Sequence, residues 1–215
     1  KIYYASSKDG KPKRLSTLRG NQMTPQLSVD GRQVAFACDT QGTADLFVQS
    51  ILPATGALTK PRQIFTAKGV ACASPTFSPD GKKIAFVCNK DGTPKIYVME
   101  IPKEGAKVKD LKPMLITKRC RENSAPSWSP DGKKLAYCAK STSARQIWLY
   151  DFETGQERQL TDGKGDKENP TWAANSHHLF FNTTDLYLIH LNSKKATKIT
   201  SGEGVKQFPY WKPKQ

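Results

Sequence analysis

Short runs of alternating apolar and polar residues, separated by turn residues, recur along this chain. The clearest copy is SPTFSPDGKKIAFV at residues 74–87, where two apolar runs flank a Pro-Asp-Gly turn. The proline presets φ for a turn, the aspartate can bond its own backbone, and the glycine accepts a positive φ. Ile84, Phe86 and Cys88 fall on one face of a period-two segment. The pattern predicts a β-hairpin with two largely buried strands.

The same hairpin pattern is repeated elsewhere in the chain. The other copies are TPQLSVDGRQVAF at 24–36, APSWSPDGKKLAY at 125–137, NPTWAANSHHLFF at 169–181, which has lost the Asp-Gly, and FPYWKPKQ from residue 208. A proline opens the first strand of each copy, at Pro25, Pro75, Pro126, Pro170 and Pro209, with separations of 50, 51, 44 and 39 residues.

Two further patterns recur along the chain. An aliphatic-aromatic-apolar triplet predicts a third strand, at residues 2–4, 46–48, 96–98, 147–149 and 186–188. A segment of the Gln-Leu-Thr type predicts a fourth, at residues 14–16, 64–66, 115–117, 159–161 and 198–200. We name the strands of a unit A to D. A repeat of about 40 to 45 residues with four strands is typical of a β-propeller, so we expect an all-β fold of four-stranded blades.

The repeats predict one propeller domain over residues 1–215, the C-terminal part of a longer chain. The expected blade units are 21–66, 72–117, 123–161 and 168–200, and a split closing unit that joins 1–17 to 206–215. The last unit supplies only a strand A, residues 208–211, so the closing blade lacks a strand B. The long C–D connections, residues 50–62 and 101–113, are expected to be extended loops or long hairpins on the outer rim.

Charge and cysteine content narrow the classes of function. The 34 basic and 19 acidic residues give a net charge of +15, spread along the chain, which favours an anionic partner or simply a basic surface. No run of 18 apolar residues occurs, so we expect no membrane insertion.

Cys38, Cys88 and Cys138 each end a strand B and are expected to fill the core. One disulfide, using Cys72 or Cys120, remains open in an oxidising compartment.

The residue patterns of several catalytic classes are missing. A glycosidase on a propeller needs two carboxylates near the axis, but the strand A segments PQLS, PTFS, PSWS, PTWA and PYWK contain no acid. A serine hydrolase of the nucleophile-elbow type needs GxSxG, which does not occur. The sequence therefore indicates a protein that is not an enzyme and uses no cofactor.

Metal and nucleic-acid sites are also disfavoured. His177 and His178 would face opposite ways in a strand, and His190 is expected to stand alone. The acidic loop at 162–168 does not follow the EF-hand order. The aromatic residues Phe77, Phe86, Tyr97, Trp128, Tyr137, Trp148 and Trp172 recur at strand positions, so we interpret them as core rather than as a base-stacking platform.

Taken together, the SPDGKKIAF hairpins, the YVMEI-type third strands, the QLT-type fourth strands and the ending VKQFPYWKP resemble the C-terminal propeller of the TolB family. The resemblance covers the whole chain. Members of that family are periplasmic components of the Tol–Pal system of double-membraned bacteria. The family propeller has six blades and follows an N-terminal α/β domain, whereas this chain shows four complete units and one split unit.

The resemblance implies a monomeric, non-catalytic scaffold that docks the lipoprotein Pal to support envelope integrity, with other Tol or outer-membrane proteins as further candidate partners. In the family, Pal contacts the loops that lead from strand D of one blade into strand A of the next. The matching positions here are Gln22, Met23, Thr24, Ala73, Ser74, Glu122, Asn123, Ser124, Ala125, Lys167, Glu168, Asn169, Lys206, Gln207 and Phe208. No nucleic acid or metal is implied.

Two other functions stay open from the residues. The SPDG repeat also occurs in propellers of prolyl-oligopeptidase-type and tricorn-type peptidases, which would make this the non-catalytic propeller of a peptidase. Alternatively, the basic charge would suit a propeller that binds an anionic polymer such as a surface polysaccharide. Steep loss of binding with added salt would support that second alternative.

Overall fold

The computed structural model describes residues 1–5, 10–40, 42–52, 55–140 and 143–210, with the side chain of Lys109 left aside. Over these residues the chain is built of β-strands, and its one helical element is the short 3₁₀ turn η1 (Val108–Asp110). No helix in this part is long and apolar enough to cross a membrane. Backbone contacts divide the chain into two compact units, residues 1–92 with 97–114 and residues 93–96 with 115–215.

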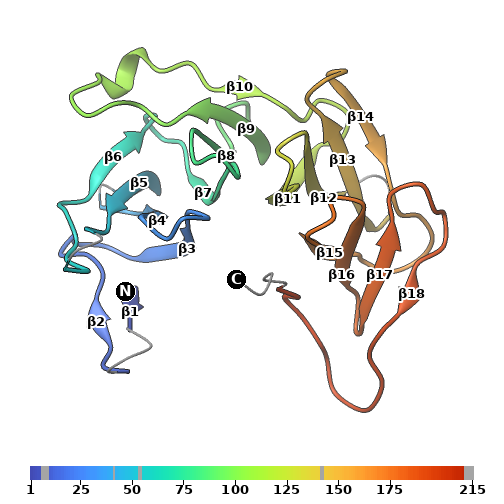
Figure 1. Ribbon diagram of the computed structural model, residues 1–215. Helices are drawn as coiled ribbons and strands as arrows, with labels where there is room; N and C mark the ends of the chain where they lie inside the picture. The colour runs from blue at the N-terminus through green and yellow to red at the C-terminus, as the bar shows by residue number, and fades with distance from the viewer. Residues whose placement is uncertain (6–9, 41, 53–54, 141–142, 211–215) are drawn as a thin grey trace. The chain divides into compact units, whose positions relative to one another are not determined.

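The first unit holds a two-stranded sheet and two four-stranded sheets (Figure 1). The small sheet pairs β1 (Tyr3–Tyr4) with β2 (Lys13–Arg14). The next sheet contains β3 (Gln22–Leu27), β4 (Gln33–Cys38), β5 (Asp45–Ser50) and β6 (Arg62–Phe65). The third contains β7 (Cys72–Phe77), β8 (Lys83–Cys88), β9 (Lys95–Glu100) and β10 (Met114–Leu115), and the boundary between the units crosses β9 and β10.

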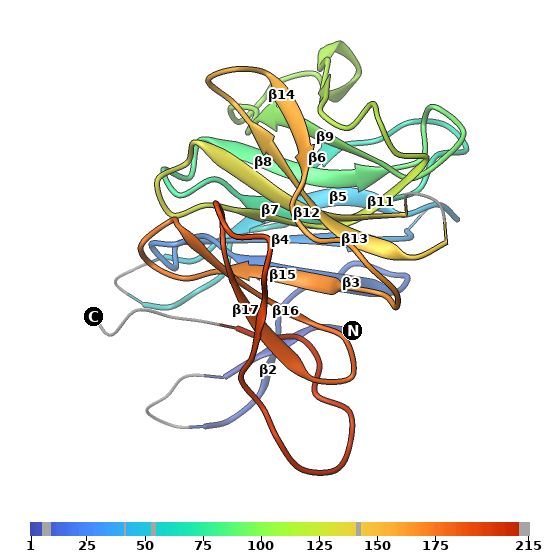
Figure 2. The same cartoon turned by 90° about the vertical axis from the view of Figure 1, so that its right-hand side faces the viewer.

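The second unit holds two further four-stranded sheets, whose strands Figure 2 shows from the side. One contains β11 (Glu122–Trp128), β12 (Lys134–Lys140), β13 (Arg145–Asp151) and β14 (Gln156–Gln159). The other contains β15 (Glu168–Trp172), β16 (His178–Asn182), β17 (Leu186–His190) and β18 (Thr197–Lys198).

Each four-stranded sheet is an antiparallel meander in sequence order, with strands A to D as the repeats predict. The fold is a β-propeller of four-stranded blades, which confirms the expected fold class. β1 and β2 match strands C and D of the split unit. Ile2 and Tyr4 pack on a core cluster that includes Leu15, Val34 and Phe36.

The A–B turns show why Ser-x-Asp-Gly folds as a hairpin. In the blade of β7 to β10, the Ser78 hydroxyl donates to Asp80 Oδ1 at 2.6 Å. The same carboxylate oxygen accepts from the backbone N–H of Lys82 at 3.1 Å. Ser78 Oγ also accepts from the backbone N–H of Lys83 at 2.9 Å. Gly81 has φ of 68°, which a side chain would disfavour. The same bonds recur around Ser28 and Ser129.

The core of each blade consists of the side chains that the alternating pattern selects. All seven aromatic residues assigned to the core from the sequence are buried, with at most 9% of any of them exposed: Phe77, Phe86, Tyr97, Trp128, Tyr137, Trp148 and Trp172. In the second unit the indole N–H of Trp172 donates to the backbone oxygen of Ser127 at 2.9 Å. This bond joins strand A of one blade to strand A of the next.

The final strand A and the C–D connections differ in detail from the expectation. Phe208–Tyr210 form no strand, because no strand B pairs with them among the described residues, and Trp211 lies outside those residues. The first long connection is a hairpin, closed by a bridge between Ile51 and Leu58. The second carries η1.

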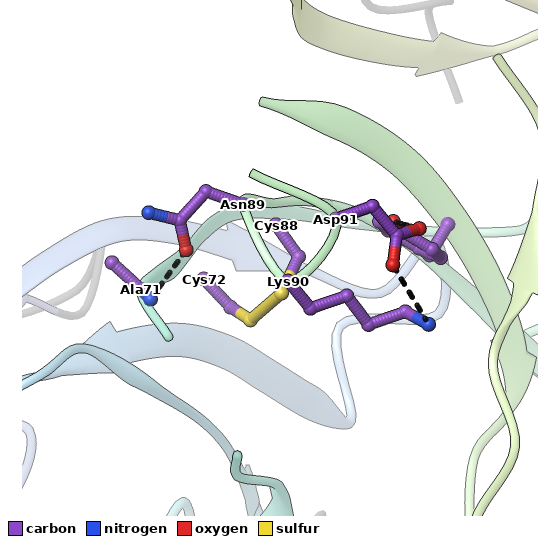
Figure 3. Close-up of a disulfide and its surroundings, with 7 residues drawn as sticks. Ala71, Cys72, Cys88, Asn89, Lys90 and Asp91 are labelled. Atoms are coloured by element: carbon purple, nitrogen blue, oxygen red, sulfur yellow. Dashed lines mark hydrogen bonds and ion pairs between the residues drawn. A yellow bond between two sulfur atoms is a disulfide. The ribbon is translucent and has the colours of Figure 1, made fainter. Parts of the chain in front are cut away.

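The cysteines separate into one bridge and three buried thiols. Cys72 on β7 and Cys88 on β8 form a disulfide (Figure 3), so Cys88 is more than a core filler. Cys38, Cys120 and Cys138 are free and buried. Burial raises the pKa of the Cys138 thiol to about 11, which keeps this sulfur protonated and unreactive at neutral pH.

Candidate functional site

A strained backbone position precedes the motif proline in every copy of the repeat. The residue before the motif proline has a positive φ in all five copies: Thr24 (48°), Ser74 (50°), Ala125 (49°), Asn169 (52°) and Phe208 (54°). In the four complete blades the strand A–strand B register shifts at this point, which marks a β-bulge. The proline lacks an N–H and cannot complete the ladder, so the bulge takes up the extra residue.

For four of the five motif prolines, the residue three positions earlier anchors the incoming loop to the preceding blade. Its backbone N–H donates to the residue just before strand C, or at its first position, in that blade. The bonds are Cys72 to Ala44 (2.8 Å), Asn123 to Pro94 (2.9 Å), Lys167 to Arg145 (2.9 Å) and Lys206 to Thr184 (2.9 Å). Each of these D–A loops is therefore fixed to a B–C loop of the neighbouring blade at the same end of the sheets.

The side chain at this position turns back into its own loop. Gln22 Nε2 donates to the backbone oxygen of Leu18 at 3.1 Å, and Asn123 Nδ2 donates to that of Cys120 at 3.0 Å. Lys167 Nζ donates to the backbone oxygen of Lys164 at 2.6 Å. In the blade of β7 to β10 this position is Cys72, which forms a disulfide with Cys88 instead.

Lys206 is the strongest example of this arrangement. Its ammonium donates to the backbone oxygens of Gly202 (2.6 Å), Gly204 (2.8 Å) and Glu203 (3.0 Å), and lies 3.6 Å from Asp185 Oδ1. Residues 161–167 and 200–206 share the spacing Thr-x-Gly-x-Gly-x-Lys. The sequence analysis missed this pattern, although the spacing was visible. These lysines act as internal braces of the loops.

The fifteen predicted contact residues therefore fall into three groups. Gln22 and Asn123 are buried, with 6% and 2% of their surface exposed. Those exposed are Met23, Thr24, Ser124, Gln207 and Phe208. The half-buried ones are Ala73, Ser74, Glu122, Ala125, Lys167, Glu168, Asn169 and Lys206. Sequence spacing finds the loops but does not distinguish their braces from their outer surface.

The acidic residues of the fourth loop neutralise a cation of the protein. Arg145 Nη1 lies 3.4 Å from Asp166 Oδ2 and 3.5 Å from Glu168 Oε1. No trio of histidine, cysteine or carboxylate side chains that could hold a metal ion occurs among the described residues. These carboxylates thus order the loop through Arg145.

A hollow of about 560 Å³ lies beside this loop in the second unit. Residues 164–168 form one wall, and Thr183 and Thr184 of the B–C turn also line it. Phe181 and Tyr187, whose rings stack with centroids 5.5 Å apart, provide an aromatic floor. The D–A end of this blade is therefore concave, with polar rims.

The histidines lie at the other end of the blade. The His190 ring centroid is 6.2 Å from that of His177 and 4.8 Å from that of His178, so the expectation that His190 stands alone is wrong. The cross-strand register of β16 and β17 pairs His178 with His190, which single-strand reasoning cannot foresee. His190 Nδ1 accepts from the backbone N–H of Asn192 at 3.1 Å. This bond gives the His190 ring a structural role at the end of strand C.

Known proteins support the same architecture. The chain matches the family described as the TolB β-propeller domain over residues 1–215. It is 56% identical to a TolB homologue of Protochlamydia amoebophila over 169 residues, which are 79% of this chain and 36% of the relative. It is 39% identical to a TolB homologue of Chlamydia pneumoniae over 216 residues, covering 98% of this chain and 49% of the relative.

Among solved structures, TolB from Acinetobacter baumannii superposes with a TM-score of 0.73 at 21% identity, covering 95% of this chain and 50% of that chain. At this identity the likeness concerns the fold alone. The chain spans about half or less of the length of the two curated relatives that it matches. The family match and the identity to these relatives establish that this chain belongs to the TolB β-propeller family.

Proposed function

We propose that this chain is the non-catalytic, protein-docking propeller of a TolB-type periplasmic scaffold, and that it binds a Pal-like lipoprotein through its D–A loops. The observation that carries the proposal is the repeated construction of these loops. A left-handed residue and a proline follow an anchored loop in four of the five repeat copies, so the outer side chains there are held in fixed positions. A surface ordered before binding loses less conformational entropy when a partner docks.

The exposed side chains of the loops have a composition that suits protein recognition. Met23 is 39% exposed and Phe208 is 72% exposed, and Thr24, Ser124 and Gln207 add polar groups. Methionine and aromatic residues are enriched in protein interfaces, whereas lysine is depleted. Since the ammonium groups of Lys167 and Lys206 donate to the backbone of their own loops, they are not free to contact a partner directly.

A location outside the cytosol agrees with the disulfide. Cys72 and Cys88 are bridged, and disulfides persist in oxidising compartments such as the bacterial periplasm. The non-catalytic assignment rests on the strand A segments, which carry no acid between the motif prolines and the A–B turns. The carboxylates of Asp166 and Glu168 in the fourth loop pair with Arg145 and order that loop.

The experiment that tests this proposal changes one exposed residue in each of the two compact units. Both residues lie two positions before a motif proline. In full-length protein, Met23→Arg and Ser124→Arg place a long cation on the docking surface, and each is expected to weaken binding of a purified Pal-like lipoprotein at least tenfold. Ala174→Arg adds the same charge at an exposed A–B turn, at the other end of its sheet, and should bind as the unmodified protein does.

Thermal unfolding of all three variants verifies that each is folded. Equal affinity for the lipoprotein across the unmodified protein, Met23→Arg and Ser124→Arg would show that the D–A loops are not the docking surface. A loss of affinity in Ala174→Arg of the same size would point to a non-specific charge effect and would also count against the proposal.

A further inference from the structure

A second concave site lies in the first unit, at the end of the sheets opposite the D–A loops. The hollow has a volume of about 420 Å³. One wall is the A–B turn at Gly81 and Lys82, and another is the end of strand C at Glu100 with the segment up to Lys103. Arg62 and Gln33 of the preceding blade complete the lining. It thus lies between two blades of one unit and involves none of the predicted docking residues.

Arg62 joins the two blades and is held in place. Its Nη1 donates to the backbone oxygen of Pro102 at 2.6 Å and approaches that of Lys103 at 3.5 Å. Within the described part of the chain, Nη2 and Nε of this half-buried guanidinium have no hydrogen-bond partner. A fixed guanidinium with spare N–H donors is suited to bind an oxyanion through two parallel hydrogen bonds.

Two lysines at the hollow have no direct ion-pair partner among the described residues, although the nearby Asp80 carboxylate attracts Lys82. Neither Lys82 nor Lys103 forms an ion pair with a described carboxylate, whereas the matching turn lysine of the next blade, Lys133, lies 2.7 Å from Glu153. The one carboxylate in the lining is that of Glu100. The carboxylate of Asp80, on the same turn, accepts hydrogen bonds from Ser78 and from the Lys82 backbone. Three cations against the carboxylates of Glu100 and Asp80 leave a local excess of positive charge that attracts anions.

We propose that this hollow binds a phosphate group, with Arg62 as the oriented donor and Lys82 and Lys103 as the charges that balance the anion. Phosphate suits the site better than a single carboxylate because it carries more charge and can accept from all three cations at once. The same chemistry is presented by soluble phosphorylated molecules and by anionic lipid headgroups, which the experiment below separates.

The second unit offers an internal comparison. Arg158 Nη2 donates to the backbone oxygen of Leu191 at 2.9 Å, which repeats the bridge made by Arg62. The backbone bonds of Ile101 to Lys82 and of Leu191 to His177 make His177 the counterpart of Lys82. The arginine bridge is therefore a shared structural feature, while the turn residue beside it is Lys82 in the first unit and His177 in the second.

The test measures binding of pyrophosphate and inorganic phosphate to the full-length protein by calorimetry, and cosedimentation with vesicles of phosphatidylglycerol or of phosphatidylcholine alone. Lys82→Gln with Lys103→Gln is expected to weaken binding at least tenfold. Lys133→Gln with Lys195→Gln removes the same charge from exposed positions of the second unit and should retain the affinity. Arg62→Gln should also lose the ligand, whereas Arg158→Gln, which breaks the equivalent bridge, should keep it.

Saturable binding of pyrophosphate that only the first-unit variants lose supports the site and identifies a soluble ligand. Binding to phosphatidylglycerol vesicles alone, with the same variant pattern, supports it with a lipid headgroup as the source. Equal weakening by both double variants would show diffuse charge attraction and overturn the proposal. Absence of binding to every probe by the folded protein would overturn it as well, and neither result would bear on lipoprotein docking at the D–A loops.

Discussion

The backbone amide of Ser74 donates a hydrogen bond to Thr24 Oγ1 at 3.1 Å. These two residues hold the same place in successive blades. Each comes directly before a motif proline and has a left-handed backbone, at φ of 50° and 48°. The bond joins β7 to β3 at their bulges, in the first unit. The bulge therefore marks the end of the D–A loop, and it also fixes the position of one strand A relative to strand A of the neighbouring blade.

Replacing the left-handed residue provides a direct measure of this backbone strain. An L-residue in the left-handed region costs about 1–2 kcal/mol. Ala125→Gly should raise the free energy of unfolding by up to about 1 kcal/mol, after allowance for the greater entropy of glycine in the unfolded chain. Ala125→Val should lower it by about 1–2 kcal/mol, because a β-branched residue tolerates this region poorly.

Urea denaturation measures both changes. Ala35→Gly, at a buried position in the middle of β4, is the matched control and should be destabilising. A loss of stability in Ala125→Gly equal to that in Ala35→Gly would mean that the backbone at Ala125 is not strained.

The Cys72–Cys88 bridge predicts a redox-dependent stability. The two cysteines are 16 residues apart, and closing a loop of about this length constrains the unfolded chain by about 3 kcal/mol. For a chain of this size that corresponds to a fall in Tm of about 6–12 °C on reduction. Cys72→Ala with Cys88→Ala should show a similar fall and no further response to dithiothreitol.

Calorimetry with and without dithiothreitol measures this effect. Cys138→Ala removes a buried free thiol and should leave the response to dithiothreitol intact. An unmodified protein with the same Tm in both conditions would contradict a stabilising bridge.

The sequence predicted the blades because their signals are local. Alternation such as that of Ile84 and Phe86, and the bonds of the Ser-x-Asp-Gly turn, act within a few residues, so one sequence suffices to recognise them. The docking residues depend on longer-range geometry. Whether Asn123 points outward or into its own loop is decided by the anchor at Pro94, and the proximity of His190 to His178 is decided by strand register. Neither relationship leaves a periodic signal in the sequence.

Asn123 is therefore expected to act through stability rather than through contact. Its amide is buried and donates to the backbone oxygen of Cys120, so Asn123→Ala should lower the free energy of unfolding by about 1–2 kcal/mol. The affinity of the folded protein for a Pal-like lipoprotein should change less than threefold. Ser124→Arg, next in the chain and exposed, should show the reverse pattern, with stability retained and affinity lost.

Denaturant titration and binding measured on the same preparations separate these effects. A variant Asn123→Ala that is as stable as the unmodified protein but no longer binds the lipoprotein would assign Asn123 to the contact surface, against the geometry of its loop.

The A–B turns predict a stability that declines in acid. The hydroxyl of Ser78 and the backbone N–H of Lys82 donate to Asp80, and these bonds hold the pKa of Asp80 below its ordinary value. The folded protein then binds a proton less readily than the unfolded chain does. The stabilisation is complete above the unfolded pKa, about 3.9, and is lost as pH falls through the lower pKa of the folded state.

Asp80→Asn keeps an oxygen acceptor but removes the charge, as Asn175 does in the fourth blade, where Oδ1 accepts from the backbone N–H groups of His177 and His178. The variant should be less stable than the unmodified protein at pH 7, and the difference should shrink between about pH 4 and pH 2 as Asp80 becomes protonated. Urea titrations at several pH values measure it. Asp162→Asn removes one carboxylate charge at an exposed position, and it serves as the control for the change in net charge. A constant gap between Asp80→Asn and the unmodified protein from pH 7 to pH 2 would contradict the role of the ionised carboxylate in the turn.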